Sequence, residues 1–366
     1  MTKEIRNQIL VIVGSVIVGV AAGLTAYLVT LNTSTAVPDV SNAQESETLS
    51  DSAISSSTHE GDAPLYITTM THMESIFKDD EREQIFQKHV ADIRWAMDLF
   101  DEYGAKLTIE SEEPFAIANT KWGVPILKEI VDKGHGVGSH ADFGYDPTGR
   151  NPMDTEELTS EAKKLKAVID DLVGAEDNQS ISGAIGTGDW VIAAHNAGYA
   201  FKDGVTGIAY LSMPESARAP GWTDAYIYEQ GYHEGVPPDF EDNIYPLALK
   251  DAKDLVSDTD PLIVVMGGEL GELASLDEGR ESCFPACAYT AADNTVVIEA
   301  IKKADDIRDR SRVAHLNMHI PVKLLTSQNE ETLRALLKAI QTYVDNGSII
   351  WETQLGAYEG YEKWGR

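Results

Sequence analysis

Short apolar runs alternate with amphipathic helical segments along most of this chain, and this alternation restricts the folds open to it. The runs after residue 64 are rich in β-branched residues, as strands are, and the segments between them have helical periodicity. Strict alternation of this kind predicts a parallel α/β sheet with helical crossovers. Seven or eight such units in about 300 residues favour a barrel over an open sheet.

The apolar periodicity also predicts where each element lies. The helix over 154–173 has a clear start, because Asp154 and Glu157 form a capping-box pattern. Strands are expected over residues 65–71, 105–111, 136–140, 181–186, 205–211, 261–267, 313–320 and 347–353. Helices are expected over residues 80–103, 122–133, 154–173, 188–198, 290–309 and 328–345.

A separate apolar segment near the N-terminus predicts a membrane anchor. Residues 9–31 carry no charge, and a helix of that length exceeds the roughly 30 Å hydrocarbon core of a bilayer. A cleaved signal peptide is the alternative, but its apolar region is only about 7–15 residues long. Lys3 and Arg6 precede the segment and no further Lys or Arg occurs before Lys78, which places residues 1–8 in the cytoplasm. We therefore expect a single-pass protein of the cell membrane with an extracellular domain.

Composition divides the rest of the chain into a linker and a domain. Residues 32–63 are rich in Ser, Thr, Ala and acidic residues and contain no aromatic residue, which predicts a disordered linker. Residues 64–366 are long enough for a large core and form the predicted extracytoplasmic domain. The net charge of −31 argues against nucleic acid or an anionic lipid surface as the main partner. Nothing in the sequence predicts an oligomeric state.

The chain has two cysteines, Cys283 and Cys287, which lie four positions apart. Neither has a His-rich segment beside it, which argues against a catalytic thiol. In an oxidising compartment they are expected to form a local disulfide.

Three predicted strands deliver histidines close to their C-terminal ends, each with a polar neighbour two positions away. Residues two apart on a strand face the same side, so each set points in one direction. In α/β barrels the C-terminal ends of the strands carry the active site. The sets are His72 with Glu74, His140 with Asp142, and His315 with Asn317 and His319.

These residue types match the ligands of a catalytic zinc site, where imidazole and carboxylate groups leave one position open. The candidate ligands are Glu74, His140, His72 and Asp142. Zinc is the expected divalent metal, and manganese and iron remain alternatives.

One segment also resembles a known family. GHGVGSH, residues 134–140, is similar to the GHEIGSH segment of polysaccharide deacetylases of the NodB-homology superfamily, carbohydrate esterase family four. There it forms the third strand after a helix that ends in Gly. The resemblance extends by position over residues 64–364, and it implies a distorted (β/α) barrel of seven or eight units, a divalent metal and hydrolysis of acetamide groups on sugars.

The first family motif departs from its usual form. The family has T-F-D-D, in which one Asp is the catalytic base and the next binds metal; here the frame is Thr71-His72-Met73-Glu74. The resemblance implies that Glu74 binds metal and that Met73 occupies the place of the base. His72 or Asp142 are candidates for that missing role.

The other family motifs match more loosely. The second metal histidine falls on Gly144, for which Asp142 is the nearest substitute. The third motif appears as GAIGTGDW without its Arg, and Asp189 lies in its vicinity. The last motif places His319 as the general acid. Glu269 and Glu110 are further acids at strand ends.

Aromatic residues after the fourth predicted strand suit a sugar ligand, because aromatic faces stack against pyranose rings. Most of these aromatic residues are expected to pack in the core, with one or two lining a groove. The candidate substrate contacts are Asp189, Trp190, Trp222, His233 and Glu269.

The leading functional prediction is a membrane-anchored, metal-dependent deacetylase of cell-surface or exported polysaccharide. One alternative is a glycosidase on a related barrel that uses two acids such as Glu74 and Glu269. Another is an inactive carbohydrate-binding or structural surface protein, which Met73 at the place of the base favours.

Overall fold

The structure, a computed structural model, describes residues 61–143, 151–184, 186–204, 207–211, 213–228, 240–283 and 286–365. The predicted anchor over 9–31, almost all of the predicted linker and His233 lie outside these residues, so they stay predictions. Within the described part of the chain, no helix has both the length and the apolar character needed to cross a bilayer.

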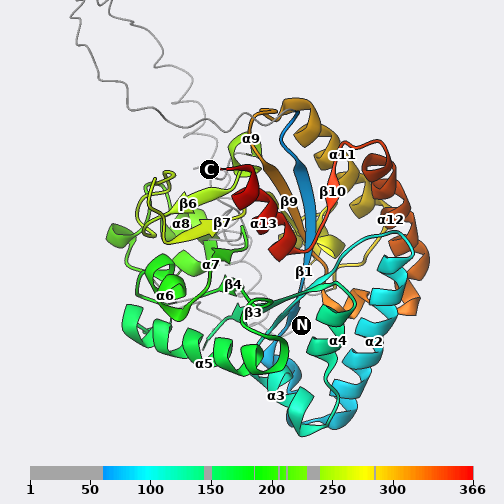
Figure 1. Cartoon of the computed structure of the whole chain (residues 1–366), viewed down its shortest axis with the longest axis horizontal. Helices are drawn as coiled ribbons and strands as arrows, with labels where there is room; N and C mark the ends of the chain where they lie inside the picture. Colours follow the sequence, from blue (N-terminus) through cyan, green and yellow to red (C-terminus); the bar gives the residue numbers. More distant parts are fainter. Residues whose placement is uncertain are drawn as a thin grey trace, which may run out of the picture. The chain divides into compact units, whose positions relative to one another are not determined.

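Ten strands form one curled sheet in the order β6-β7-β5-β4-β3-β2-β1-β9-β8, with β10 paired to β1 (Figure 1). Its strands are β1 (Leu65–Met73), β2 (Thr108–Ser111), β3 (Gly136–Ala141), β4 (Ser180–Gly183), β5 (Phe201–Lys202), β6 (Leu247–Leu249), β7 (Ile263–Val265), β8 (Glu269–Glu272), β9 (Ala314–His319) and β10 (Ile350–Trp351). All ladders are parallel except that between β6 and β7.

The sheet is more open than the predicted barrel. No ladder joins its two ends among the described residues; instead, residues 243 and 244, just before β6, accept backbone hydrogen bonds from Gly268 and His315. The result is a curled sheet around a central interior, which agrees with the α/β class and with a distorted barrel.

Helices lie along the outside of the sheet (Figure 1). The capping box of α5 is confirmed, since Asp154 accepts from the backbone N–H of Glu157 and Glu157 accepts from that of Asp154. The helices are α2 (Glu83–Asp101), α3 (Glu113–Lys121), α4 (Ile126–Asp132), α5 (Thr155–Val173), α6 (Trp190–Ala197), α7 (Gly207–Tyr210), α8 (Asp224–Tyr226), α9 (Phe240–Asn243), α10 (Arg280–Cys283), α11 (Ala291–Ile307), α12 (Glu330–Asp345) and α13 (Gln354–Trp364).

The predicted strand over 205–211 is wrong. Residues Gly207–Tyr210 form the short helix α7, and all four are buried. A short apolar run looks the same in a buried helix and a buried strand, so its periodicity could not separate the two. The sequence reading also missed α3, α13 and the short strands β5, β6 and β8.

Strand β1 shows how the sheet separates its two faces. Leu65, Ile67 and Met73 pack in the main core under the outer helices. Tyr66 belongs instead to a second cluster inside the curl, and His72 lines a pocket at the C-terminal end of the strand. Because successive side chains alternate, a single strand supplies the outer core and the interior at once.

The interior has two different ends. At the N-terminal ends of the strands, which we call the closed end, Tyr66, Phe201 and Val264 pack against α13, where Phe201 stacks on Tyr358 with ring centroids 4.7 Å apart. This helix crosses in front of the strands in Figure 1. At the C-terminal ends, which we call the pocket end, the interior is lined by charged side chains.

Candidate metal centre and catalytic pocket

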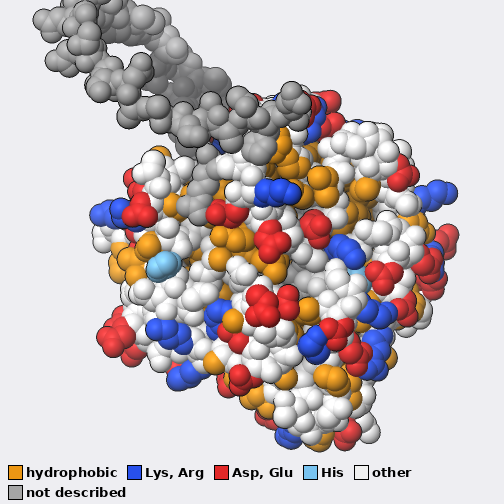
Figure 2. All heavy atoms as spheres, in the orientation of Figure 1, with side chains coloured by type: hydrophobic (Ala, Val, Ile, Leu, Met, Phe, Trp, Pro, Cys, Tyr) orange, Lys and Arg blue, Asp and Glu red, His pale blue; other side chains and the backbone are white. Residues whose placement is uncertain are grey.

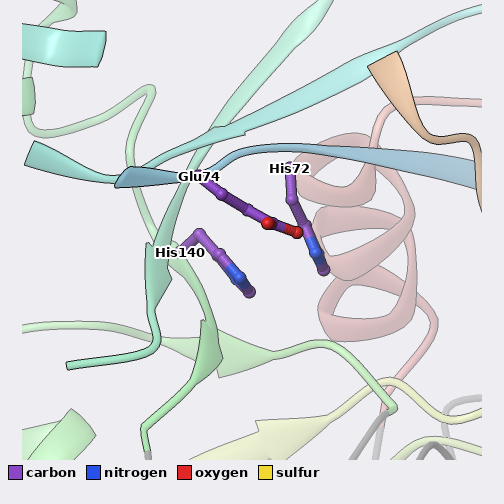
Figure 3. A group of neighbouring side chains, drawn as sticks. All are labelled: His72, Glu74 and His140. Atoms are coloured by element: carbon purple, nitrogen blue, oxygen red, sulfur yellow. The ribbon is translucent and has the colours of Figure 1, made fainter. Parts of the chain in front are cut away.

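Three predicted ligands converge at the pocket end. His72 is near the end of β1, Glu74 follows that strand directly, and His140 lies on β3. One ligand atom from each lies within 4.8 Å of those of the other two, and Figure 3 shows the three side chains pointing toward one common region. Two imidazoles and a carboxylate are a donor set that fits zinc or a similar divalent ion with a position left open. The residues therefore fit the metal that the sequence predicted.

His72 is held by a buried acid and by its histidine neighbours. Its Nε2 lies 3.1 Å from Oε2 of Glu110, which is on β2 and has no exposed surface. The ring stacks on His140 at 3.8 Å and on His319 at 4.5 Å between centroids. Burial raises the pKa of Glu110 above its usual value, although hydrogen bonding and nearby cationic groups partly oppose this.

His140 is fixed through both ring nitrogens. Nδ1 lies 2.7 Å from the hydroxyl oxygen of Ser182 on β4, and Nε2 lies 3.4 Å from Oδ2 of Asp142. Burial disfavours the charged imidazole, but Asp142 and the nearby acids outweigh burial and raise the pKa of His140 to about 9. Binding a metal through this ring therefore requires loss of a proton at neutral pH.

Asp142 depends on a glycine for its position. Gly183 has φ +71°, and a Cβ built there would lie 2.2 Å from Oδ1 of Asp142. Among the described groups that oxygen is buried and has no hydrogen-bond partner. Burial alone would raise the pKa of Asp142, but the neighbouring His140 overcomes it and lowers the pKa.

The three candidate ligands open onto a pocket of about 120 Å³. Its other wall carries acids: Glu269 at the start of β8 and Asp203 directly after β5. Asp203 pairs with the buried Lys202, yet burial raises the pKa of Asp203 to about 6. The described lining residues are Met70, His72, Glu74, His140, Asp142, Ser182, Gly183, Asp203, Ile208, Glu269, Gly271, Glu272 and His319.

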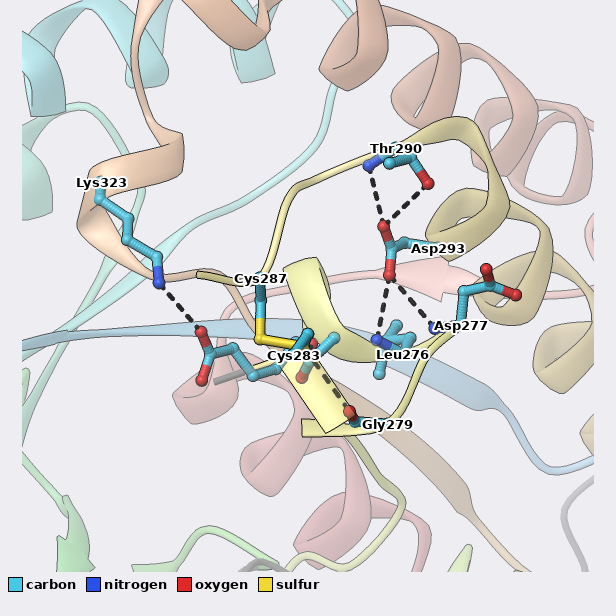
Figure 4. The surroundings of a disulfide bond; sticks show 10 residues. Leu276, Asp277, Gly279, Cys283, Cys287, Thr290, Asp293 and Lys323 are labelled. Atoms are coloured by element: carbon cyan, nitrogen blue, oxygen red, sulfur yellow. Dashed lines mark hydrogen bonds and ion pairs between the residues drawn. A yellow bond between two sulfur atoms is a disulfide. The ribbon is translucent and has the colours of Figure 1, made fainter. Parts of the chain in front are cut away.

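The cysteines take no part in this pocket. The expected disulfide between Cys283 and Cys287 is confirmed, and it closes a short loop after α10 (Figure 4). Lys323 pairs with Glu272 in the same region. Bonded thiols offer no metal ligand, which leaves nitrogen and oxygen donors to define the candidate centre.

The late histidine set divides between the pocket and the interior beneath it. His319 reaches the pocket, whereas His315 and Asn317 are buried below it on the same face of β9. Nε2 of His315 lies 2.9 Å from Oγ1 of Thr68, and Nδ1 lies 2.9 Å from the carbonyl oxygen of Gly267. Burial lowers the pKa of His315 to about 4, so this ring is neutral.

Three predicted substrate contacts lie outside the pocket. Asp189 caps α6 and accepts from the backbone N–H groups of Ile192 and Ala252. Trp190 has no exposed surface and Trp222 is 3% exposed, so both pack in the core. Amino-acid composition alone could not show whether these aromatic rings are buried in the core or exposed to stack on a sugar. Of the predicted substrate contacts, the structure brings only Glu269 to the pocket among the described residues.

The sequence reading missed two residues of the pocket, Ser182 on β4 and Asp203 directly after β5. Ser182 lies on a predicted strand, but a serine there carries no signal of its own. Asp203 follows a strand of only two residues, Phe201–Lys202, which no periodicity can reveal.

No protein-family model matches the sequence, and no curated protein matches it either. Several solved structures have similar folds, including the following two. A protein described as a polysaccharide deacetylase from Mycobacterium smegmatis has a TM-score of 0.51 and 11% identity, over 84% of this chain and 93% of the other. Puue allantoinase has a TM-score of 0.51 and 12% identity, over 87% of this chain and 98% of the other. The resemblance found in the sequence is therefore confirmed for the fold: this chain has the fold of the polysaccharide deacetylases.

Proposed function

We propose that this protein is a metal-dependent hydrolase that removes acetyl groups from sugars of a polysaccharide. The observation that carries the proposal is the convergence of His72, Glu74 and His140 within 4.8 Å at the C-terminal ends of β1 and β3. Active sites of α/β barrels lie at that end of the strands. The deacetylase fold and the adjoining pocket support the same reaction class.

Each residue has a separate task in this proposal. His72, Glu74 and His140 would hold the divalent metal, for which zinc fits the donor set. A metal bound there would polarise the acyl carbonyl and favour ionisation of a water molecule. Glu110 orients the His72 ring and Ser182 orients the His140 ring, as partners of metal-binding histidines commonly do.

Asp142 is the best-placed general base. Met73, at the family position of the base, is fully buried in the outer core and does not reach the pocket. Asp142 lines the pocket, and its Oδ1 has no hydrogen-bond partner among the described groups. Its ionised carboxylate can accept a proton from water, although the pKa lowered by His140 makes it a weaker base than an ordinary Asp. His319, whose ring stacks on that of His72, would donate a proton to the leaving group.

We also propose that the domain works outside the cytoplasm, anchored by residues 9–31 through the linker over 32–63. The excess of positive charge before that segment supports this orientation. Such an anchor would confine the enzyme to polymer at the cell surface or in export.

Release of acetate from acetylated oligosaccharides by the purified full chain is the test. Activity should disappear with a chelator and return with added zinc, manganese or another divalent ion. Protein that binds no metal under any of these conditions would contradict the proposal.

The second candidate is a protein that binds carbohydrate without hydrolysing it, and the buried Met73 favours it. It predicts that sugar binding survives replacement of both His72 and Glu74 by Ala. The deacetylase proposal predicts loss of activity in the same variant.

A further inference from the structure

Three of the described acids that line the pocket have no task in the proposed reaction: Asp203, Glu269 and Glu272. Glu269 starts β8, the strand at one end of the sheet order, and it is half-buried as a residue. Its two carboxyl oxygens have different surroundings, and this difference indicates what the side chain does.

Oε1 of Glu269 accepts two hydrogen bonds. Nδ2 of Asn317 donates to it at 2.7 Å, and the backbone N–H of Gly204 donates at 3.0 Å. The amide of Asn317 also lies beside Thr68, with Oδ1 2.8 Å from the hydroxyl oxygen. Two donors on Oε1 fix it as the oxygen that carries no proton.

The backbone around Glu269 leaves room for this arrangement. A Cβ added to Gly204 would lie 2.8 Å from Cγ of Glu269 and 2.9 Å from the backbone of Gly267. Any other residue at 204 would push the side chain away from Asn317. The position of Glu269 is therefore set by its surroundings from two strands.

Oε2 is different: it is buried and has no hydrogen-bond partner among the described groups. The charged groups around it are mainly acidic. Asp203 and Glu110 repel a negative charge on Glu269, Lys202 is paired with Asp203, and Glu272 and His319 line the same pocket. Burial first and Asp203 second raise the pKa of Glu269 well above its usual value.

We propose that Glu269 remains a neutral carboxylic acid and that its Oε2–H group donates a hydrogen bond to an oxygen of the acetylated sugar. The inference rests on the proposed function for the nature of the substrate. It assigns a binding role to a proton that stays on Glu269 throughout, so no bond to that proton breaks. Buried carboxylic acids can act as donors in this way at neutral pH.

This role selects among sugars. An acceptor oxygen, such as an acyl carbonyl or a hydroxyl, satisfies Oε2–H. A carboxylate or sulfate substituent would also face Asp142 and Asp203, whose negative charges oppose it. The site should therefore prefer neutral acetylated sugars over polymers rich in uronic acid.

Two substitutions in the full-length protein test whether Glu269 acts as a neutral hydrogen-bond donor or as an ionised carboxylate. E269Q keeps an N–H donor in nearly the same shape, so KM should stay within about threefold of wild type. E269L removes the donor, so KM should rise by about 10- to 100-fold with bound metal unchanged. E299Q, on the exposed side of α11, is the matched control and should behave as wild type.

The pH profile gives a second readout. Substrate affinity of wild type should fall as pH rises through the pKa of Glu269, because ionisation removes the donor. E269Q should lack this decrease. Equal loss of affinity in E269Q and E269L, or the same decrease in E269Q, would overturn the inference; the first result would indicate an ionised Glu269 that binds a cationic group.

Infrared spectroscopy tests the protonation state without substrate or metal. The difference spectrum between wild type and E269Q at pH 7 should contain the carbonyl band of a non-ionised carboxyl group, and E299Q should leave that band in place. Absence of the band overturns the inference even if acetate is released. If the band is present and no acetylated sugar is hydrolysed, the proposed function fails and the protonation of Glu269 stands; binding of sugar to wild type and E269L then decides its role.

Discussion

The closed end and the pocket end of the interior are built by the same strands and have opposite chemistry. At the closed end Tyr66, Phe201 and Val264 form an apolar cluster that packs against α13. At the pocket end His72 on β1 and Glu74 directly after this strand contribute to a polar pocket. The same strands therefore serve both purposes. Residues near the N-terminal ends of the strands stabilise the fold, and residues near the C-terminal ends line the candidate active site.

Between the two ends lies a polar layer that belongs fully to neither. Thr68, His315 and Asn317 are buried there and bonded to one another or to the backbone. Buried polar groups cost stability unless they are paired, so this layer is expected to be sensitive to any loss of partner. It also holds Glu269 in place through Asn317. On the face shown in Figure 2, by contrast, acidic and basic side chains are interspersed.

The largest effect is expected from removal of a metal ligand. His140→Ala should lower hydrolysis by about 10³-fold or more, equivalent to about 4 kcal/mol of transition-state stabilisation, and should abolish stoichiometric metal binding. Metal analysis and acetate release measure the two effects. His195→Ala, at an exposed position of α6, is the control and should change neither. If the H140A protein were unfolded, the pocket end would also be needed for stability, and the proposed difference between the closed end and the pocket end would be wrong.

Phe201→Ala tests the closed end. Phe201 has no exposed surface and stacks on Tyr358, so its truncation should cost about 3–5 kcal/mol of unfolding free energy. Denaturant unfolding measures this loss. At temperatures where the variant is folded, metal affinity should equal that of wild type. A large loss of metal affinity in the folded variant would show that the two ends are not independent.

The polar layer should make stability depend on pH. The pKa of His315 is about 4 in the folded protein and about 6.5 when unfolded, so only the unfolded chain gains a proton between these values. Stability should thus fall as pH decreases from about 6.5 to about 4, by about 3 kcal/mol from this residue.

Urea unfolding across that pH range, for wild type and His315→Gln, isolates this contribution. Burial also lowers the pKa of His135 to about 4. His135 therefore adds a further loss of stability as the pH falls, and this loss is the same in both proteins. Identical pH dependence in wild type and H315Q would contradict the prediction.

Gly183→Ala gives the smallest expected effect on stability, about 1–2 kcal/mol, because φ is positive and the new Cβ meets Asp142. Activity should fall as well, since the carboxylate must move. Gly123→Ala is a matched control: φ is +69° there and nothing lies within 4 Å of an added Cβ. It should lose similar backbone energy and keep full activity. Equal activity of the two variants would show that Asp142 takes no part in the reaction.

Local patterns in the sequence predicted much of this arrangement. The two-residue period predicted that His72 and Glu74 face the same side, and both line the pocket. Asp154 with Glu157 marked the start of α5. Both features depend on neighbours a few positions away, which the sequence displays directly.

Features that depend on distant contacts could not be predicted. Trp190 and Trp222 have the composition of a sugar platform, but burial under the outer helices makes them core residues. Asp203 becomes important only because β5 lies next to β4 and β7 in the curl. The same limit explains why Glu269 could be named while its hydrogen-bond partners could not.

The order of strands around the curl has a consequence for how the protein assembles. The candidate metal ligands come from β1 and β3, which β2 joins within residues 65–141, whereas β1 pairs with β9 across a separation such as the 249 positions between Thr68 and Asn317. Contacts distant in sequence carry a greater loop-closure entropy and generally form late. During synthesis the N-terminal segments also emerge first. We therefore expect the three candidate ligands to come together through local strand pairings before the long-range pairing of β1 with β9 brings His319 to the pocket.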